Sequence, residues 1–343
     1  MNIGIVNDTP LAVEAIRRVL QKNNRHCVIW VAEDGAQAVA HCQKNTPDLV
    51  LMDLVMPGMN GMQATQEIMR SSPTAILAVT ASVDKNCSLA FGAMGAGALD
   101  VICTPTLGDA EGETAFLRKI DQIQRLTQSK RRPSGLIRSG ASESGGTQSD
   151  TALGASKLIA IGCSAGGPAA LSEILGTLPQ QFDASIVIVQ HIDENFINDL
   201  ATWLNGRSAC PLRLAIAGDR PRPGEALLAN TGGQLLLSSS GKLYYGERDS
   251  DCSYFPSVDG LFSSIARYWR GDALGIILTG MGRDGSQGLL AMKKRGFCTI
   301  AQDQASSAIY GMPKAAMTCG AANEAVPLNH IADRISRWIK HGE

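Results

Sequence analysis

Several features are missing from this 343-residue sequence. No apolar run approaches the roughly 18–20 residues that cross a bilayer, so direct insertion into a membrane is not expected. The opening residues MNIGIV enter a strand pattern without a preceding basic and apolar leader, which predicts that there is no signal peptide. The nine cysteines occur singly, with no C-x-x-C pair. This disfavours a disulfide framework or a zinc site and predicts a cytoplasmic protein with reduced thiols.

An excess of charge of one sign is also lacking. The formal net charge is −1, and no dense stripe of lysine and arginine occurs. Nucleic acid is therefore not the expected partner. Hydrophobic residues make up 44% of the chain and charged residues 18%, a balance that allows sizeable buried cores. A chain of this length is expected to form two domains.

Two segments with α/β patterns flank a polar stretch. Residues 1–126 contain five short apolar runs separated by helical patterns, which predicts a doubly wound parallel sheet. Residues 127–156 are rich in serine and glycine and are expected to form a flexible linker. In residues 157–343 the α/β pattern resumes, and short runs between Pro211 and Glu247 predict hairpins at one edge. This second domain is predicted to be doubly wound and mostly parallel, with an antiparallel appendix.

Polar residues follow the expected strands of the first domain. Asp8, Asp53, Thr80 and Thr104 stand at strand ends, where doubly wound sheets place their sites. The carboxylates of Asp8 and Asp53 suit an octahedral Mg²⁺ site completed by water and a phosphoryl group. Thr80 can donate a hydrogen bond to a phosphoryl oxygen. Asp8 also suits the cap of the helix that begins with DTPLAVEA, alone or together with the metal role.

The stretch IAIGCSAGGP at residues 159–168 places Ser164 among glycines after an apolar run. It fits a nucleophile elbow, a phosphate-binding loop or a plain strand-to-helix turn. It lacks the lysine of G-x-x-x-x-G-K-[ST], and no acidic ribose partner ends the next strand, which disfavours a nucleotide site. The glycines instead allow backbone amides to approach an oxyanion, and the amides of Ala165 and Met281 are the candidates.

A nucleophilic serine needs a base and an orienting carboxylate. Among five histidines, His191 follows the strand pattern SIVIVQ and is expected at the same sheet edge as Ser164; the alternative is a hydrogen-bonded loop histidine. Asp284, in the turn LTGMGRDGSQG, is the candidate carboxylate, although an acid there also suits a helix N-terminus. The chain order Ser, His, Asp differs from that of α/β-hydrolases and disfavours their fold.

The first segment, through the two aspartates, MPGMNGM, AVTAS and Pro105, resembles the receiver domain of response regulators. The resemblance implies a flavodoxin-like fold with a five-stranded parallel sheet. It also implies that Asp53 accepts a phosphoryl group from a CheA-like histidine kinase, with Mg²⁺ held by Asp8 and Asp53. Thr80 would be the switch hydroxyl.

The first segment departs from the receiver pattern at two positions. Asn7 replaces an acidic residue, which removes one negative charge near the expected metal. Thr104 replaces a lysine that normally pairs with the phosphoryl group. Threonine offers only a hydrogen bond, so the phosphoryl charge is expected to be neutralised less well.

The second segment resembles the catalytic domain of CheB methylesterases through IGCSAGGP, IVQHI, PGEALLA, PSVDGLF, LTGMGRDGSQGL and SSAIYGMPKAA. The resemblance implies that Ser164 is the nucleophile, His191 the base and Asp284 the orienting acid. The amides of Ala165 and Met281 would form the oxyanion hole, without a cofactor for the esterase. The opening IGIVNDTPLAVEAIRR is most like the Wsp-type branch of the family.

The function implied by this resemblance is protein-glutamate methylesterase activity, with glutamine deamidation as a second activity, under control of receiver phosphorylation. The substrate would be a methyl-accepting chemoreceptor-like protein in a chemosensory pathway. Two alternatives stay open: a phosphorylation-regulated, receptor-binding adaptor with little turnover, and a general serine esterase. A DNA-binding regulator is disfavoured, because the second segment is not basic and shows no helix-turn-helix pattern.

Overall fold

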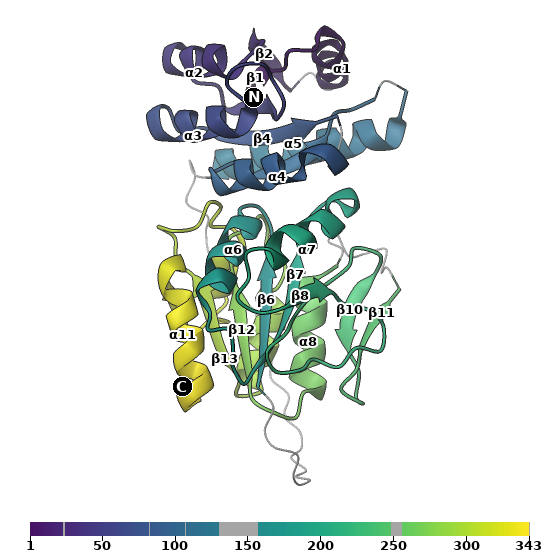
Figure 1. The fold of residues 1–343 in the computed structure, drawn as a ribbon, viewed down its shortest axis with the longest axis vertical. Coiled ribbons are helices and arrows are strands. Elements are labelled where there is room, and N and C mark those ends of the chain that lie inside the picture. Colours follow the sequence, from purple (N-terminus) through teal and green to yellow (C-terminus); the bar gives the residue numbers. More distant parts are fainter. Residues whose placement is uncertain (23–24, 82, 107, 130–156, 248–255, 343) are drawn as a thin grey trace.

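The computed structural model describes residues 1–22, 25–81, 83–106, 108–129, 157–247 and 256–342. It consists of two α/β units stacked along the long axis of the molecule (Figure 1). Most of the expected linker, residues 130–156, lies outside the described residues.

The first unit is a five-stranded parallel sheet in the order β2-β1-β3-β4-β5. Its strands are β1 (Asn2–Val6), β2 (Cys27–Ala32), β3 (Leu49–Asp53), β4 (Ala75–Thr80) and β5 (Asp100–Cys103). Its helices are α1 (Pro10–Gln21), α2 (Gly35–Lys44), α3 (Gly61–Ser71), α4 (Val83–Gly95) and α5 (Ala110–Ser129). Helices α2, α3 and α4 pack in a row, and α1 packs with α5. This confirms the predicted receiver architecture. Helix α5 continues three residues past residue 126, into the range expected to be linker.

The second unit is a seven-stranded parallel sheet in the order β14-β13-β12-β6-β7-β9-β8. Its strands are β6 (Leu158–Cys163), β7 (Ser185–Gln190), β8 (Leu212–Leu214), β9 (Ala226–Leu228), β12 (Ala273–Ile277), β13 (Cys298–Gln302) and β14 (Glu324–Val326). Its helices are α6 (Gly167–Thr177), the 3-10 turn η1 (Glu194–Phe196), α7 (Ile197–Asn205), α8 (Val258–Tyr268), α9 (Ser286–Lys294), α10 (Met312–Thr318) and α11 (Leu328–His341). The central strands are buried along their whole length, because helices cover both sheet faces.

The antiparallel appendix is a single hairpin of β10 (Gln234–Leu237) and β11 (Leu243–Gly246). The prediction of hairpins throughout residues 211–247 was wrong for β8 and β9, which pair in parallel within the main sheet. Ser238 and Lys242 close the β10–β11 hairpin tightly, whereas the longer connection between β8 and β9 lets the chain return and run parallel. The sequence reasoning missed β14, because three residues carry no measurable periodicity.

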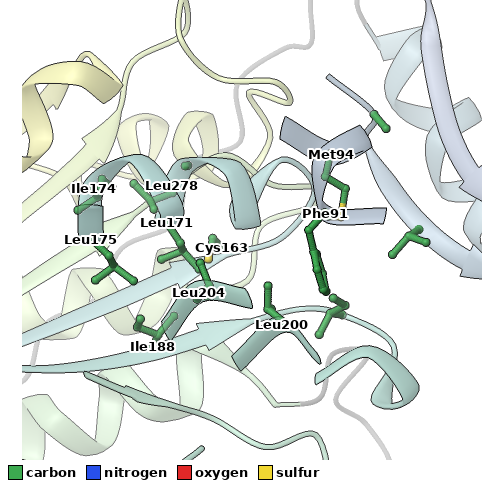
Figure 2. Close-up of a cluster of buried hydrophobic side chains, with 14 of the residues drawn as sticks. Phe91, Met94, Cys163, Leu171, Ile174, Leu175, Ile188, Leu200, Leu204 and Leu278 are labelled. Carbon is green, nitrogen blue, oxygen red and sulfur yellow. The ribbon is translucent and has the colours of Figure 1, made fainter. Parts of the chain in front are cut away.

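The two units are in direct contact through helix α4 (Figure 2). Phe91 and Met94 are buried in the same apolar cluster as Leu200 and Leu204 of α7. The centroids of the Phe91 and Trp203 rings lie 5.2 Å apart. In addition, the carbonyl of Leu99, just before β5, accepts a hydrogen bond of 3.2 Å from the amide of Gly166. The first unit therefore covers the end of the second sheet at which β6 meets α6.

Candidate functional site

Ser164 lies in a tight turn between β6 and α6. Gly166 has a φ of 77°, a left-handed conformation that favours glycine. A Cβ at this position would also lie 2.7 Å from the Cβ of Ala308. Pro168 stands in the first turn of α6, where a missing amide hydrogen costs little. The turn leaves Ser164 at the carboxyl end of a central strand, 8% exposed beneath the first unit.

His191 occupies the equivalent position on the neighbouring strand. Cys163 and Gln190 are register partners in β6 and β7, so Ser164 and His191 are the next residues along. The amide of His191 donates to the carbonyl of Cys163 at 3.0 Å, which continues the ladder into the site. The Nε2 atom of the His191 ring lies 2.8 Å from Oδ2 of Asp284.

Asp284 sits in the turn between β12 and α9, against the N-terminus of α8. The hydroxyl of Ser257 donates to its Oδ1 at 2.9 Å, and the amides of Asp259 and Gly285 donate to the same oxygen at 3.0 Å each. The amide of Val258 donates to Oδ2 at 2.7 Å. Burial opposes ionisation of this carboxyl, but the hydrogen bonds from the His191 ring and from the backbone hold the pKa of Asp284 below its ordinary value. The group is thus a fixed anion beside the imidazole.

The two candidate oxyanion donors, the amides of Ala165 and Met281, lie on turns that approach each other. A Cβ on Gly280 would lie 2.8 Å from the Cβ of Ser164, so glycine permits the close approach of the two turns. Among the described residues, neither of the two candidate amides donates to a protein acceptor. Ala165 and Met281 belong to one buried cluster with Leu99 of the first unit. The side chains of both residues therefore pack against the first unit.

Two residues that the sequence reasoning missed, Ser257 and Asp259, surround Asp284. Both lie in the PSVDGLF stretch, whose only sequence signal was the family resemblance. The Oδ1 atom of Asp259 accepts a hydrogen bond of 2.6 Å from the amide of Gly288 and so joins α8 to α9. Burial and the neighbouring charge of Asp284 raise the pKa of Asp259 to about 6. This second carboxylate thus destabilises the folded protein when it is ionised.

An Asp259→Asn protein is expected to be more stable than the wild type at pH 8. Asparagine keeps a carbonyl oxygen for the Gly288 amide and removes the charge beside Asp284. Because the folded-state pKa is raised, the destabilisation of the wild type is absent below pH ~4, grows towards pH 6 and is complete above it. Discounted for partial exposure, the gain at pH 8 is about 1 kcal/mol. Urea unfolding followed by tryptophan fluorescence measures it; an equal difference at pH 4.5 and pH 8 would contradict the electrostatic cause.

The carboxyl ends of β3, β4 and β5 bring the first unit's predicted site residues to one sheet edge. Asp53 pairs in register with Val79, directly before Thr80, and the amide of Thr104 donates to the carbonyl of Thr80 at 2.9 Å. Burial, and to a lesser extent the charge of Asp8, raise the pKa of Asp53. The two carboxylates are therefore close enough to repel each other, as expected of a cation site.

Residues 7–9 bear on the capping role considered for Asp8. Thr9 is the N-cap of α1, and no side chain caps that helix, so Asp8 does not serve as its cap. Asp8 is exposed, whereas Asn7 is buried and its Oδ1 accepts a hydrogen bond of 2.8 Å from the amide of Thr9. Asn7 therefore fixes the turn, and Asp8 is the carboxylate that faces the solvent near Asp53.

Membrane-spanning helices and clusters of metal ligands are both absent from the described residues. None of the helices in the described ranges combines the length and the apolar character needed to cross a membrane. Within those ranges no cluster of three or more histidine, cysteine, aspartate or glutamate side chains is arranged to hold a metal. An ion between Asp8 and Asp53 would thus keep several water ligands, as Mg²⁺ usually does.

Known proteins match both units. The family model described as CheB methylesterase matches residues 159–335, and that of the response regulator receiver domain matches residues 3–109. A Burkholderia thailandensis protein named protein-glutamate methylesterase/protein-glutamine glutaminase 4 is 52% identical over 343 residues, which is 99% of this chain and 98% of that protein. A Burkholderia lata protein named protein-glutamate methylesterase/protein-glutamine glutaminase 1 is 51% identical, with 98% of each chain covered.

A solved structure matches the second unit. The catalytic domain of the Thermotoga maritima CheB methylesterase is 32% identical, with a TM-score of 0.50, and covers 52% of this chain and 96% of its own. Sequence and structure agree in this assignment, and the two relatives span almost the whole chain. The chain therefore belongs to the CheB methylesterase family and carries a response regulator receiver domain in front of the methylesterase domain.

Proposed function

We propose that this protein hydrolyses glutamate methyl esters on a methyl-accepting, chemoreceptor-like protein. The observation that carries the proposal is the hydrogen-bonded pair of His191 and Asp284 beside Ser164, at the tips of three adjacent strands. Relatives that match over almost the whole chain are named as protein-glutamate methylesterases and protein-glutamine glutaminases. The proposed division is a receiver at residues 1–126, a linker at 127–156 and a catalytic domain at 157–343, with the last turn of α5 inside the linker range.

The reaction begins with attack of the Ser164 hydroxyl oxygen on the ester carbonyl carbon. Because Nε2 of His191 donates to Asp284, Nδ1 is the ring atom that takes the serine proton. The carbonyl oxygen becomes an oxyanion that accepts hydrogen bonds from the amides of Ala165 and Met281. The Nδ1 proton then passes to the departing methoxide, and methanol leaves an acyl-enzyme.

Water completes the cycle. His191 removes a proton from the water as it attacks the acyl carbon, and returns that proton to the oxygen of Ser164 as the ester bond breaks. A free glutamate side chain is the product. Asp284 stays ionised throughout and holds the ring with Nε2–H towards itself. With a glutamine substrate the leaving group is ammonia, so the same residues support the second activity in the relatives' names.

The receiver is the proposed regulator. Asp8 and Asp53 would hold Mg²⁺, and their mutual repulsion and hard oxygen donors fit that ion. When bound, the ion neutralises charge as a phosphoryl group is transferred to Asp53. Thr80 is the proposed switch hydroxyl, and Thr104 can offer the phosphoryl group only a hydrogen bond. The unphosphorylated receiver covers Ala165 and Met281, so its displacement would open the site.

The proposed setting is the adaptation arm of a chemosensory pathway of the Wsp type. The phosphodonor would be a CheA-like histidine kinase. The substrate would be the helical, cytoplasmic part of the receptor, and the protein is accordingly expected in the cytoplasm. Asn7 and the absent lysine at position 104 support the Wsp assignment.

The proposal is tested by methanol release from a methylated receptor, with and without acetyl phosphate and Mg²⁺. Wild type is expected to be stimulated by the phosphodonor, and Asp53→Ala to keep the basal rate without stimulation, because only the phosphoryl acceptor is lost. Turnover that equals the uncatalysed rate in both states would favour an adaptor. Equal turnover of small methyl esters and of receptor would favour a general esterase.

Removal of the Trp203 ring is expected to raise the basal rate of the unphosphorylated protein about three- to tenfold. This ring contacts Phe91 of the receiver. It also stacks against the guanidinium of Arg207, whose Cζ atom lies 4.3 Å from the ring centroid. An aromatic contact of this kind contributes about 0.5–1.5 kcal/mol to docking. Methanol release by Trp203→Ala without phosphodonor measures the effect. Tyr268→Ala removes a partly buried ring of α8 and is the matched control; an equal increase there would argue against receiver release.

A further inference from the structure

We infer that Gln190 is a positioning residue that orients the peptide group between Ser164 and Ala165, and with it the oxyanion-binding amide. This inference rests on the proposed function. Gln190 ends β7 and is 1% exposed, at the carboxyl end of the sheet. Its side-chain Nε2 donates to the carbonyl of Ser164 at 2.9 Å and to the carbonyl of His191 at 2.8 Å. One side-chain amide thus binds the backbone of both the proposed nucleophile and the proposed base.

The direction of the Ala165 amide follows from the bond to Ser164. In a trans peptide the carbonyl and the following N–H point in opposite directions. The Ser164 carbonyl points towards its two donors, the side chain of Gln190 and the amide of Gly167 at 2.8 Å. The N–H of Ala165 therefore points away from Gln190, to the side where a substrate oxyanion would lie. Donation to the carbonyl also polarises the peptide group and strengthens its N–H as a donor.

Gly167 provides the space that this arrangement needs. A Cβ on Gly167 would lie 2.0 Å from Oε1 of Gln190, closer than any real contact. That oxygen is buried and has no hydrogen-bond partner among the described residues. The Gln190 side chain thus keeps its orientation at the expense of one buried acceptor, because its NH₂ group is directed at the two backbone carbonyls. The second glycine of the SAGG turn is explained by the glutamine rather than by backbone strain.

The test compares Gln190→Met, Gly167→Ala and the double variant with wild type. Loss of a whole oxyanion donor costs about 10²–10³-fold in kcat, and a misdirected donor part of that. Each single variant is expected to lower kcat for methanol release about 10- to 100-fold, with KM within about threefold. Both substitutions act through the same side chain. The kcat of the double variant is therefore expected to lie within about threefold of the kcat of the slower single variant.

Thr299→Val is the matched control. Thr299 is fully buried in β13, at the end of the sheet opposite to the site, and its hydroxyl donates to the Ala321 carbonyl at 2.8 Å. The variant is expected to lower the melting temperature but to leave kcat within about twofold. A kcat of Gln190→Met within threefold of wild type, or multiplicative losses in the double variant, would overturn the inference.

The labelling rate of Ser164 by a fluorophosphonate is measured in parallel for every variant. This reagent forms a bond from phosphorus to the serine oxygen and releases fluoride, and its phosphoryl oxygen occupies the oxyanion position. If wild type releases no methanol, the proposed function fails. The labelling rate of Gln190→Met relative to wild type then decides the positioning role alone: a loss of tenfold or more supports it, and an unchanged rate refutes it.

Discussion

A Ser164→Ala protein is expected to lose methanol release by at least about 10⁴-fold. Loss of the nucleophile removes the acyl-enzyme route altogether, and only the oxyanion donors and substrate binding then remain. The turn itself should survive, because its conformation depends on Gly166 and on backbone bonds. The amide of Ser164 donates to the carbonyl of Thr279, and its carbonyl is bound by Gln190. Neither bond involves the hydroxyl.

The measurement is methanol release from a methylated receptor under single-turnover and steady-state conditions. Circular dichroism and the melting temperature of the variant should match those of wild type. Ser239→Ala, on the exposed connection between β10 and β11, is the matched control and is expected to be fully active. Residual turnover of Ser164→Ala within about 100-fold of wild type would mean that the hydroxyl is not the nucleophile, and that water attacks the ester directly.

The elements that carry the site follow from the sequence for a simple reason. In a parallel sheet the carboxyl ends of all strands lie at one edge. A long buried strand such as β6 or β7 is visible as an apolar run, and the residue after it is therefore placed at that edge. The positions of Ser164 and His191 at this edge could be predicted in this way. The strand order, with β12 beside β6, then brings the turn of Asp284 to the same place.

The residues that support the site could not be derived in the same way. Gln190 is the last residue of an apolar strand, and nothing local shows that its side chain turns back to bind two carbonyls. Asp259 lies in the first turn of α8, where an acid is common for a different reason. Its contact with Gly288 joins two helices that are distant in the sequence. Such contacts depend on the packing of α8 against α9, which no periodicity encodes.

The contact between the two units is a further property that only the structure shows. Helix α4 has apolar residues on more than one side, which in an isolated domain would be a poor surface pattern. Phe91 and Met94 explain it, because they are buried against α7 of the other unit. Likewise, the sequence does not show that Asn7 is buried and accepts a hydrogen bond from the amide of Thr9, whereas Asp8 is exposed.

An Asp284→Asn protein is expected to lose about 10³–10⁴-fold in kcat. The reason is that the substitution changes the tautomer of His191, moving the ring proton from Nε2 to Nδ1. Five groups of the described residues hydrogen-bond to this carboxylate as donors: three bind Oδ1, and the amide of Val258 and Nε2 of His191 bind Oδ2. An asparagine keeps its carbonyl oxygen towards the three donors and so directs its NH₂ group at His191. The ring then accepts at Nε2 and carries its proton on Nδ1, where it cannot accept the proton of Ser164.

The same substitution is expected to lower stability, since the NH₂ group also faces the amide of Val258 without an acceptor. In wild type the lowered pKa of Asp284 means that its stabilising contribution is complete above the unfolded carboxyl pKa of about 4 and is lost only as pH falls through the lower folded value. Protonation of Asp284 therefore cannot cause a fall in wild-type activity between pH 8 and pH 5.

Steady-state kcat, the fluorophosphonate labelling rate and urea unfolding together separate the two effects of Asp284→Asn. Asp303→Asn provides the matched control, because Asp303 directly follows β13 at the same sheet edge and binds the amide of Ser306 rather than a histidine. Its kcat should stay within about threefold of wild type. If Asp284→Asn keeps kcat within tenfold while it unfolds more easily, the carboxylate serves the fold alone. If labelling and kcat fall together at a temperature where the variant is folded, it orients the base.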